Sequence, residues 1–259
     1  MSTGGAKPAR WFATVARIAT VSLGLGAVAW GGLVAPTAWR QLPMAPMAVK
    51  ILGGEPFGPG VLDNFVTGAK PQAWEVVCQP VTLRTMAVIR LRFAELAIAD
   101  GNGASIRQTQ STLDAALRRA LSCTPTDPLL WFAMFWLQNN VRGLQQDNFR
   151  SLRMSYRLGP NEGWLSLRRI RFAVAIYPGL PADLKQQATD EFVQLVKSGF
   201  ITDAADILAG PGTAVRDMLL SSLRGIDSRK LRFLSVLLAG KGVDDAFPEL
   251  DLSSRLRRQ

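Results

Sequence analysis

The chain has 259 residues, a net charge of +10 and no histidine, and 48% of its residues are hydrophobic. Without histidine it lacks the commonest general base and the commonest metal ligand, which excludes a Ser-His-Asp triad and histidine-based metal sites. Its two cysteines do not have the spacing of a metal-binding pair. Since no other catalytic set is recognisable, we expect a protein that is not an enzyme and that holds neither a cofactor nor a metal.

Residues 18–39 form an uncharged stretch of 22 residues, and no acidic residue precedes Glu55. A helix of roughly 20 apolar residues is long enough to cross a bilayer. Basic residues flank the stretch, three before it and two after it: Lys7, Arg10, Arg17, Arg40 and Lys50. The positive-inside rule therefore predicts a cytoplasmic N-terminus over 1–17 and a transmembrane signal-anchor over 18–39. We expect a single-pass protein of the inner (cytoplasmic) membrane, with its body periplasmic or otherwise extracytoplasmic.

Two alternatives remain for this segment. A charged start and an apolar middle also fit a cleaved signal peptide, and Ala27-Val28-Ala29 is a small-x-small site inside the apolar run. The segment could also be a buried helix of a soluble protein. The signal-anchor and the signal peptide both place the residues after 40 outside the cytoplasm.

The body of the chain is predicted to be all-α. Residues 40–79 contain Pro46, Pro56 and Pro59 with several glycines, which indicates an irregular linker. Beyond them, apolar residues recur at helical spacing between turn signals. Helices are expected over 80–99, 105–122, 128–141, 144–158, 162–176, 182–198, 202–209, 213–223 and 227–239. We divide this body into helical hairpins over 80–200, C-terminal helices over 201–242 and a tail over 243–259.

Two turns in the body are similar to each other. Residues 120–127 (ALSCTPTD) match residues 155–162 (SYRLGPNE), so that Pro125 and Pro160 lie 35 residues apart. Thr126 or Asp127 is expected to cap the helix after the first turn, and Asn161 the helix after the second, where Glu162 matches Asp127. A helix pair that recurs at this interval is typical of a solenoid.

This repeat resembles the tetratricopeptide repeat family. In that pattern a helix ends with a small residue, then come proline and a bulky aromatic that opens the next helix. Ala120, Pro125 and Trp131 fit it, and Ser155, Pro160 and Trp164 fit more loosely. The glycine and tyrosine of the family pattern are absent, since Phe135 and Gln138 stand there. The resemblance covers about residues 105–200 and implies stacked helix hairpins that bind proteins; an irregular helical bundle is the alternative.

The two cysteines are Cys78 and Cys123. If helices 80–99 and 105–122 form a hairpin, these residues lie at the same end of it. In an oxidising compartment we expect them to form a disulfide. The alternative is two unrelated buried thiols.

Arginine is the polar residue that stands out, because 13 arginines and no lysine occur between Lys70 and Lys185. Helical spacing places Arg150, Arg153 and Arg157 on one face of a helix, and Arg168 and Arg171 repeat the step on the next one. Arginine matches the geometry of carboxylates and phosphates. We therefore name these five residues, with Trp131 and Trp164, as candidate binding residues; a solvated arginine face is the alternative.

Two functions from different classes remain. The first is a membrane-anchored scaffold that binds envelope proteins, as repeat solenoids do, with surface-polysaccharide assembly (polysaccharide biosynthesis) or secretion as the process. The second is a binding module for an anionic glycan, lipid headgroup or small molecule through the arginines. The expected partners are the membrane and envelope proteins, and nucleic acid is not expected.

Overall fold

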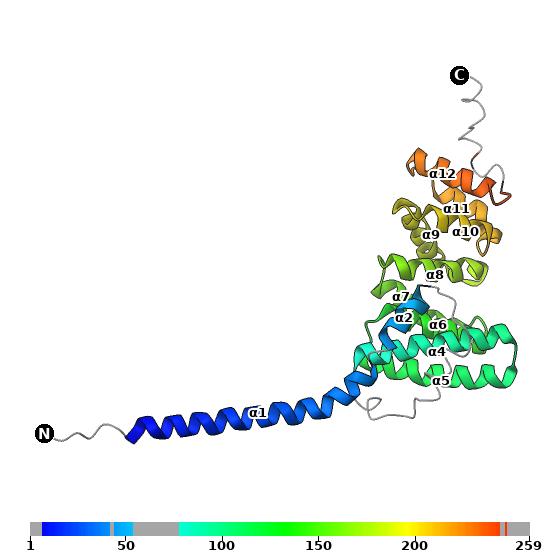
Figure 1. Ribbon diagram of the computed structural model, residues 1–259. Coiled ribbons are helices and arrows are strands. Elements are labelled where there is room, and N and C mark those ends of the chain that lie inside the picture. Colours follow the sequence, from blue (N-terminus) through cyan, green and yellow to red (C-terminus); the bar gives the residue numbers. More distant parts are fainter. Residues whose placement is uncertain (1–6, 42–43, 54–77, 244–246, 248–259) are drawn as a thin grey trace. The chain divides into compact units, whose positions relative to one another are not determined.

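The computed structural model describes residues 7–41, 44–53, 78–243 and 247, and it is all-α over these ranges, which confirms the predicted fold class (Figure 1). The chain forms two compact units that meet between Cys123 and Thr124. We describe each unit by itself.

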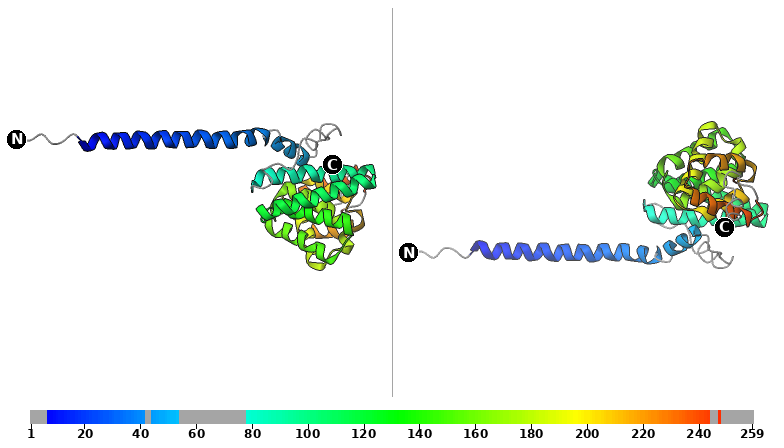
Figure 2. Two further views of the ribbon diagram at one scale, coloured as in Figure 1. Left: turned by 90° about the horizontal axis from the view of Figure 1, so that it is seen from below. Right: turned by 90° about the horizontal axis from the view of Figure 1, so that it is seen from above.

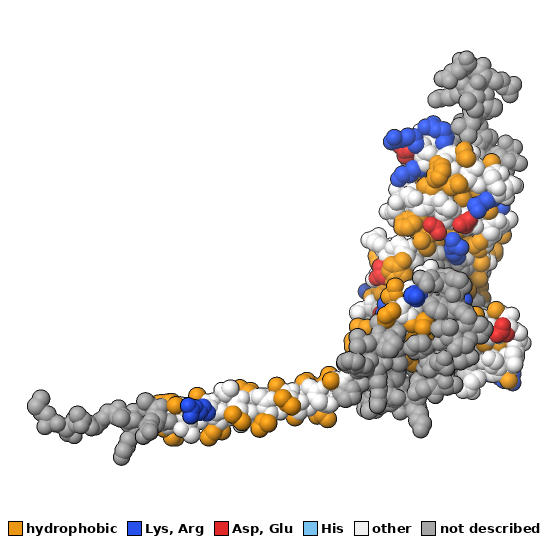
Figure 3. Space-filling view, in the orientation of Figure 1, with side chains coloured by type: hydrophobic (Ala, Val, Ile, Leu, Met, Phe, Trp, Pro, Cys, Tyr) orange, Lys and Arg blue, Asp and Glu red, His pale blue; other side chains and the backbone are white. Residues whose placement is uncertain are grey.

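The first unit begins with one long helix, α1 (Lys7–Gln41), which extends past both ends of the predicted span. Its stretch Trp11–Ala35 has a mean hydropathy of 1.8 and is 0% buried. Figure 2 shows α1 as a continuous rod, and Figure 3 shows hydrophobic side chains along its length. By length and composition, α1 is the described helix that can cross a membrane.

A short helix, α2 (Met44–Leu52), lies within the stretch that we predicted to be irregular, so that prediction is wrong there. Pro46 occupies its first turn, where a proline costs no helical hydrogen bond. Ala48 and Ile51 are buried, and α2 packs against the next described helix, α4. The rest of the predicted linker up to residue 77 lies outside the described residues.

Helices α4 (Pro80–Asp100) and α5 (Gly103–Cys123) form a hairpin and lie side by side in Figure 1 and in the left view of Figure 2. Gly101 ends α4 at φ 73°, a left-handed conformation that glycine adopts without strain. The Asn102 side chain accepts hydrogen bonds from the amides of Ala104 and Ser105 and so caps α5. Leu113, Leu117 and Ala120 form the fully buried face of α5.

The second unit contains seven described α-helices: α6 (Pro128–Arg142), α7 (Phe149–Leu158), α8 (Gly163–Ala175), α9 (Ala182–Lys197), α10 (Ile201–Ala209), α11 (Arg216–Ser222) and α12 (Ser228–Ala239). Helix α6 packs on α7, α8 on α9, and α10 on α12, while α9 also contacts α10 and α11. Pro128 and Gly163, the first residues of α6 and α8, are 35 residues apart, which is also the distance in sequence between Pro125 and Pro160. The body is thus a succession of helix pairs.

Local chemistry explains where these helices begin. Asp127 caps α6, because its Oδ1 accepts hydrogen bonds from the amides of Leu129 and Leu130. The matching prediction for α8 is wrong. That helix begins after Glu162, whose side chain makes no capping hydrogen bond, and Asn161 lies outside the cap position. Glutamate is a poor N-cap residue compared with aspartate and asparagine.

The start of α7 also differs from the prediction, which placed it at residue 144. A short 3₁₀ turn, Gln146–Asn148, comes first. The buried Asn148 donates a hydrogen bond from Nδ2 to the carbonyl of Gly143, 2.9 Å away, and Gly143 has φ 71°. Gln145 is extended, with φ −116° and ψ 150°, so the 3₁₀ turn begins after it and the α-helix starts at Phe149.

Aromatic rings fill the centre of the second unit. Phe135 is fully buried, with its ring centroid 5.7 Å from that of Phe172 and 6.3 Å from that of Phe149. Eight residues of α6 are buried, in keeping with the apolar character of nearly its whole surface. The turn after α7 packs against the start of α6 so closely that a Cβ on Gly159 would lie 2.7 Å from Pro128. Glycine is therefore required at that turn.

Candidate functional site

The α7 arginines lie on the exposed side of an amphipathic helix. Phe149, Leu152 and Tyr156 are buried on the inner side, while Arg150 and Arg157 are exposed on the outer side. We call Arg150, Arg153 and Arg157 the α7 arginine face. The spacing predicted this arrangement.

Arg153 is held by a carboxylate from another helix. Its guanidinium makes a bidentate interaction with Asp183, in the first turn of α9. Nε donates to Oδ2, and Nη2 donates to Oδ1 at 3.0 Å. Arg153 lowers the pKa of Asp183. Both side chains stay open to solvent, so the pair contributes little stability, but it fixes the middle guanidinium of the face.

The two arginines predicted on α8 have different surroundings. Arg171 reaches Asp203 of α10, with 3.4 Å between Nη2 and Oδ1, and Arg168 is half-buried and engaged in an interaction. Arg153 and Arg171 are therefore tied to different acids on different helices, and no shared acid joins these two arginines into one stripe.

The two candidate tryptophans also differ. The Trp131 indole N–H donates a hydrogen bond to the carbonyl of Pro125 at 2.7 Å, so this ring stabilises the turn ahead of its own helix. Trp164, in the first turn of α8, is 39% exposed and has an interaction partner. Trp131 therefore has a local structural role.

The most highly connected polar group was missed by the sequence analysis. Arg169 of α8 is 0% exposed, and it pairs with Glu191 of α9 through Nε, 3.0 Å from Oε1, and through Nη2. Nη1 donates to the Ser155 carbonyl at 2.9 Å, and Nη2 donates to the Gly159 carbonyl at 3.0 Å. The guanidinium also lies 4.1 Å from the centre of the Tyr156 ring.

These contacts make Arg169 a junction of three helices. The carbonyls that it binds belong to Ser155, in the last turn of α7, and to the C-cap residue Gly159; the Ser155 carbonyl also accepts a hydrogen bond from the Gly159 amide. The Arg169 guanidinium therefore stabilises the C-terminal end of α7 and also neutralises the Glu191 carboxylate of α9. A signal was present in the sequence: Arg169 follows Leu165 at four residues and precedes Ala173 by four, on the buried face of α8.

A small pocket of about 80 Å³ lies beside this junction. Its lining includes Asn161, Ser166, Glu191 and Phe200. Burial raises the pKa of Glu191, and this effect exceeds the opposing influence of Arg169. The Glu191 carboxylate already accepts hydrogen bonds from Arg169, and the pocket is large enough only for a very small group.

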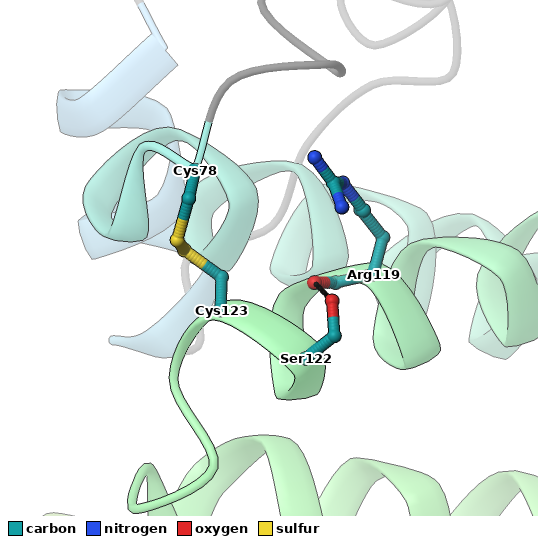
Figure 4. Close-up of a disulfide and its surroundings, with 4 residues drawn as sticks. All are labelled: Cys78, Arg119, Ser122 and Cys123. Atoms are coloured by element: carbon teal, nitrogen blue, oxygen red, sulfur yellow. Dashed lines mark hydrogen bonds between the residues drawn. A yellow bond between two sulfur atoms is a disulfide. The ribbon is translucent and has the colours of Figure 1, made fainter.

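A disulfide closes the hairpin of the first unit (Figure 4). It joins Cys78, which precedes α4, to Cys123, the last residue of α5, with the two Cα atoms 5.6 Å apart. This is the pairing that the expected hairpin predicts. Because Cys123 is also the last residue of the first unit, the bond ties the entry of α4 to the point where the second unit begins.

Comparisons with protein-family models, with curated proteins and with solved structures find no match. Within the described ranges, no group of three acidic or cysteine side chains is arranged to hold a metal ion. The functional assignment therefore depends on the chain's own features.

Proposed function

We propose that this chain is a membrane-anchored docking protein whose helical body binds a partner protein of the cell envelope. The observation that carries the proposal is α1, whose apolar stretch Trp11–Ala35 is long enough to cross a bilayer and makes no contact that buries it. Apolar surface of this extent needs a cover, and lipid provides one.

Two independent features support the side of the membrane that we propose for the body. Basic residues are more numerous before α1 than after it, which favours a cytoplasmic N-terminus. A disulfide between Cys78 and Cys123 persists only in an oxidising compartment. Both features support a body outside the cytoplasm, and the inner membrane of a bacterium is the setting that we propose.

The docking role is supported by the succession of helix pairs and by the resemblance of two turns to tetratricopeptide repeats. Arrays of this kind present extended surfaces to other proteins. Surface-polysaccharide assembly and secretion are the processes in which we would look for the partner first.

The anchor is tested by placing charges in the middle of α1. We expect Val21→Arg combined with Leu25→Arg to release the protein from alkaline-washed membranes, because each arginine costs about 2.5–3.5 kcal/mol at the centre of a membrane helix. The apolar exchanges Val21→Leu and Leu25→Ile are the matched control and should stay in the pellet. Retention of the double arginine variant would contradict the anchor, and a shorter wild-type protein that washes off would identify a cleaved leader.

A second candidate function is the binding of an anionic glycan, lipid headgroup or small molecule. The observation that favours it is the α7 arginine face, where Arg150 and Arg157 are exposed on either side of the fixed Arg153. Among the described residues, no ion pair neutralises either of these two arginines.

One pair of variants separates the two candidates. The first variant carries a photo-crosslinking amino acid in place of Arg157, and the docking function predicts that it forms one discrete protein adduct in native membranes. The control carries the same photo-crosslinking amino acid at Gln108, an exposed position of α5. Arg150→Glu combined with Arg157→Glu should leave membrane retention unchanged. If these changes abolish binding to immobilised heparin while Arg157 yields no adduct, the anion-binding function replaces docking through this face.

A further inference from the structure

Helix α12 exposes apolar side chains that no described part of the chain covers. Leu234 and Leu238 are fully buried on its inner side, where α12 packs on α10. On the outer side Phe233 is 51% exposed and Val236 is 58% exposed, three residues apart on one helical face. Figure 3 shows hydrophobic side chains on α12 with lysine and arginine side chains gathered at one end of it.

The basic end of α12 has little negative charge around it. Arg229 is 85% exposed, and its closest carboxylate, that of Asp227, is 3.7 Å away and already caps the helix. Arg232 is half-buried and Arg224 is exposed, and neither forms an ion pair within the described residues. From Arg216 to Val243, both included, the chain carries six basic and two acidic side chains.

We infer that α12 is a second membrane contact, which lies in the plane of an anionic lipid surface with Phe233 and Val236 in the headgroup layer. A basic helix that exposes an apolar face beside its cationic side chains has the composition of an interfacial helix. Arginines beside that face attract anionic lipid, and their long side chains can reach the headgroups while the apolar residues insert.

The inference rests on the anchoring role proposed for α1, because α1 keeps a bilayer within reach of the tethered body. Two large apolar side chains bury too little area to hold a free protein on a membrane. A tether converts that weak contact into an intramolecular one with a high effective concentration. The contact is therefore reversible and depends on anionic lipid, which distinguishes it from the insertion of α1.

The test uses the full-length protein in vesicles. Val236→Cys is labelled with the fluorophore NBD without reductant, so that the Cys78–Cys123 bond stays closed, and the protein is reconstituted in phosphatidylcholine vesicles with or without 30% phosphatidylglycerol. We expect a blue shift and quenching by doxyl-labelled lipid only when phosphatidylglycerol is present. Gln187→Cys, at an exposed position of α9, is the matched control and should show neither.

The charge dependence provides a second readout. Arg229→Glu combined with Arg232→Glu should lower the ratio of bound to unbound α12 by at least about twenty-fivefold, since each basic side chain near an anionic surface contributes roughly fivefold. In every variant the protein should still float with the vesicles, which reports on α1 separately. Protein that fails to float contradicts the anchor rather than the α12 contact.

Three results would overturn the inference. The label could stay solvent-exposed in phosphatidylglycerol vesicles. It could become shielded only in native membranes, which would identify a protein partner on α12. It could also be shielded equally in both lipids and become exposed when the chain is ended after Val243, which would assign the face to the chain's own residues 244–259.

Discussion

Replacing Arg169 by methionine is expected to destabilise the protein by about 3–5 kcal/mol, the usual cost of removing one partner of a buried ion pair. The change leaves the Glu191 carboxylate buried without a cation and removes the donors to the Ser155 and Gly159 carbonyls. Urea unfolding of the full-length protein in detergent micelles, followed by tryptophan fluorescence, measures the loss.

The matched control is Arg171→Met on the same helix. Arg171 pairs with Asp203 in the open, where ion pairs contribute at most about 1 kcal/mol. Combining Arg169→Met with Glu191→Leu should recover part of the loss, because no buried charge then remains unpaired. Equal losses for Arg169→Met and Arg171→Met would show that the junction does not carry the stability assigned to it.

The pH dependence of the loss gives a further check. Burial already raises the pKa of Glu191 above its ordinary value of 4.5. A carboxyl group whose folded-state pKa is raised contributes stability at low pH that is lost as the pH rises through that pKa. Without Arg169 the pKa rises further, so the cost of Arg169→Met should be smaller near pH 5 than at pH 8. A cost that does not change with pH would mean that Glu191 stays solvated in the variant.

Removal of the disulfide is expected to have the second large effect. Opening a loop with a sequence separation of 45 residues costs about 3–4 kcal/mol of unfolding free energy, mainly through the entropy of the unfolded chain. Cys78→Ser combined with Cys123→Ser should show this loss in urea, and a reductant should lower the wild-type protein to the same level without affecting the double variant.

The oxidation state itself is measured by alkylation. In the wild-type protein in its native membrane, both thiols should resist alkylation until a reductant is added. Free labelling of both cysteines would contradict the disulfide, and with it one of the two arguments for an extracytoplasmic body.

Features that depend on a few neighbouring residues could be predicted from the sequence. The Asp127-Pro128 start of α6, the Gly101 end of α4 and the uncharged run within α1 each follow from local hydrogen bonding, backbone freedom or side-chain polarity. The same reasoning predicted the hairpin that brings Cys78 and Cys123 together, because a short turn returns the chain beside itself. Where a local rule was weak, as at Glu162, the prediction was wrong.

The tertiary structure alone decided which polar groups meet. The sequence does not say which acids the arginines at 153, 169 and 171 meet, yet one is buried with Glu191 and two are held at the surface by Asp183 and Asp203. These pairs join residues 22, 30 and 32 positions apart, and they form only because particular helices pack together. Likewise, the spacing of apolar residues shows that α12 is amphipathic, but it does not show which of them are buried. The packing against α10 buries Leu234 and Leu238 and leaves Phe233 and Val236 exposed.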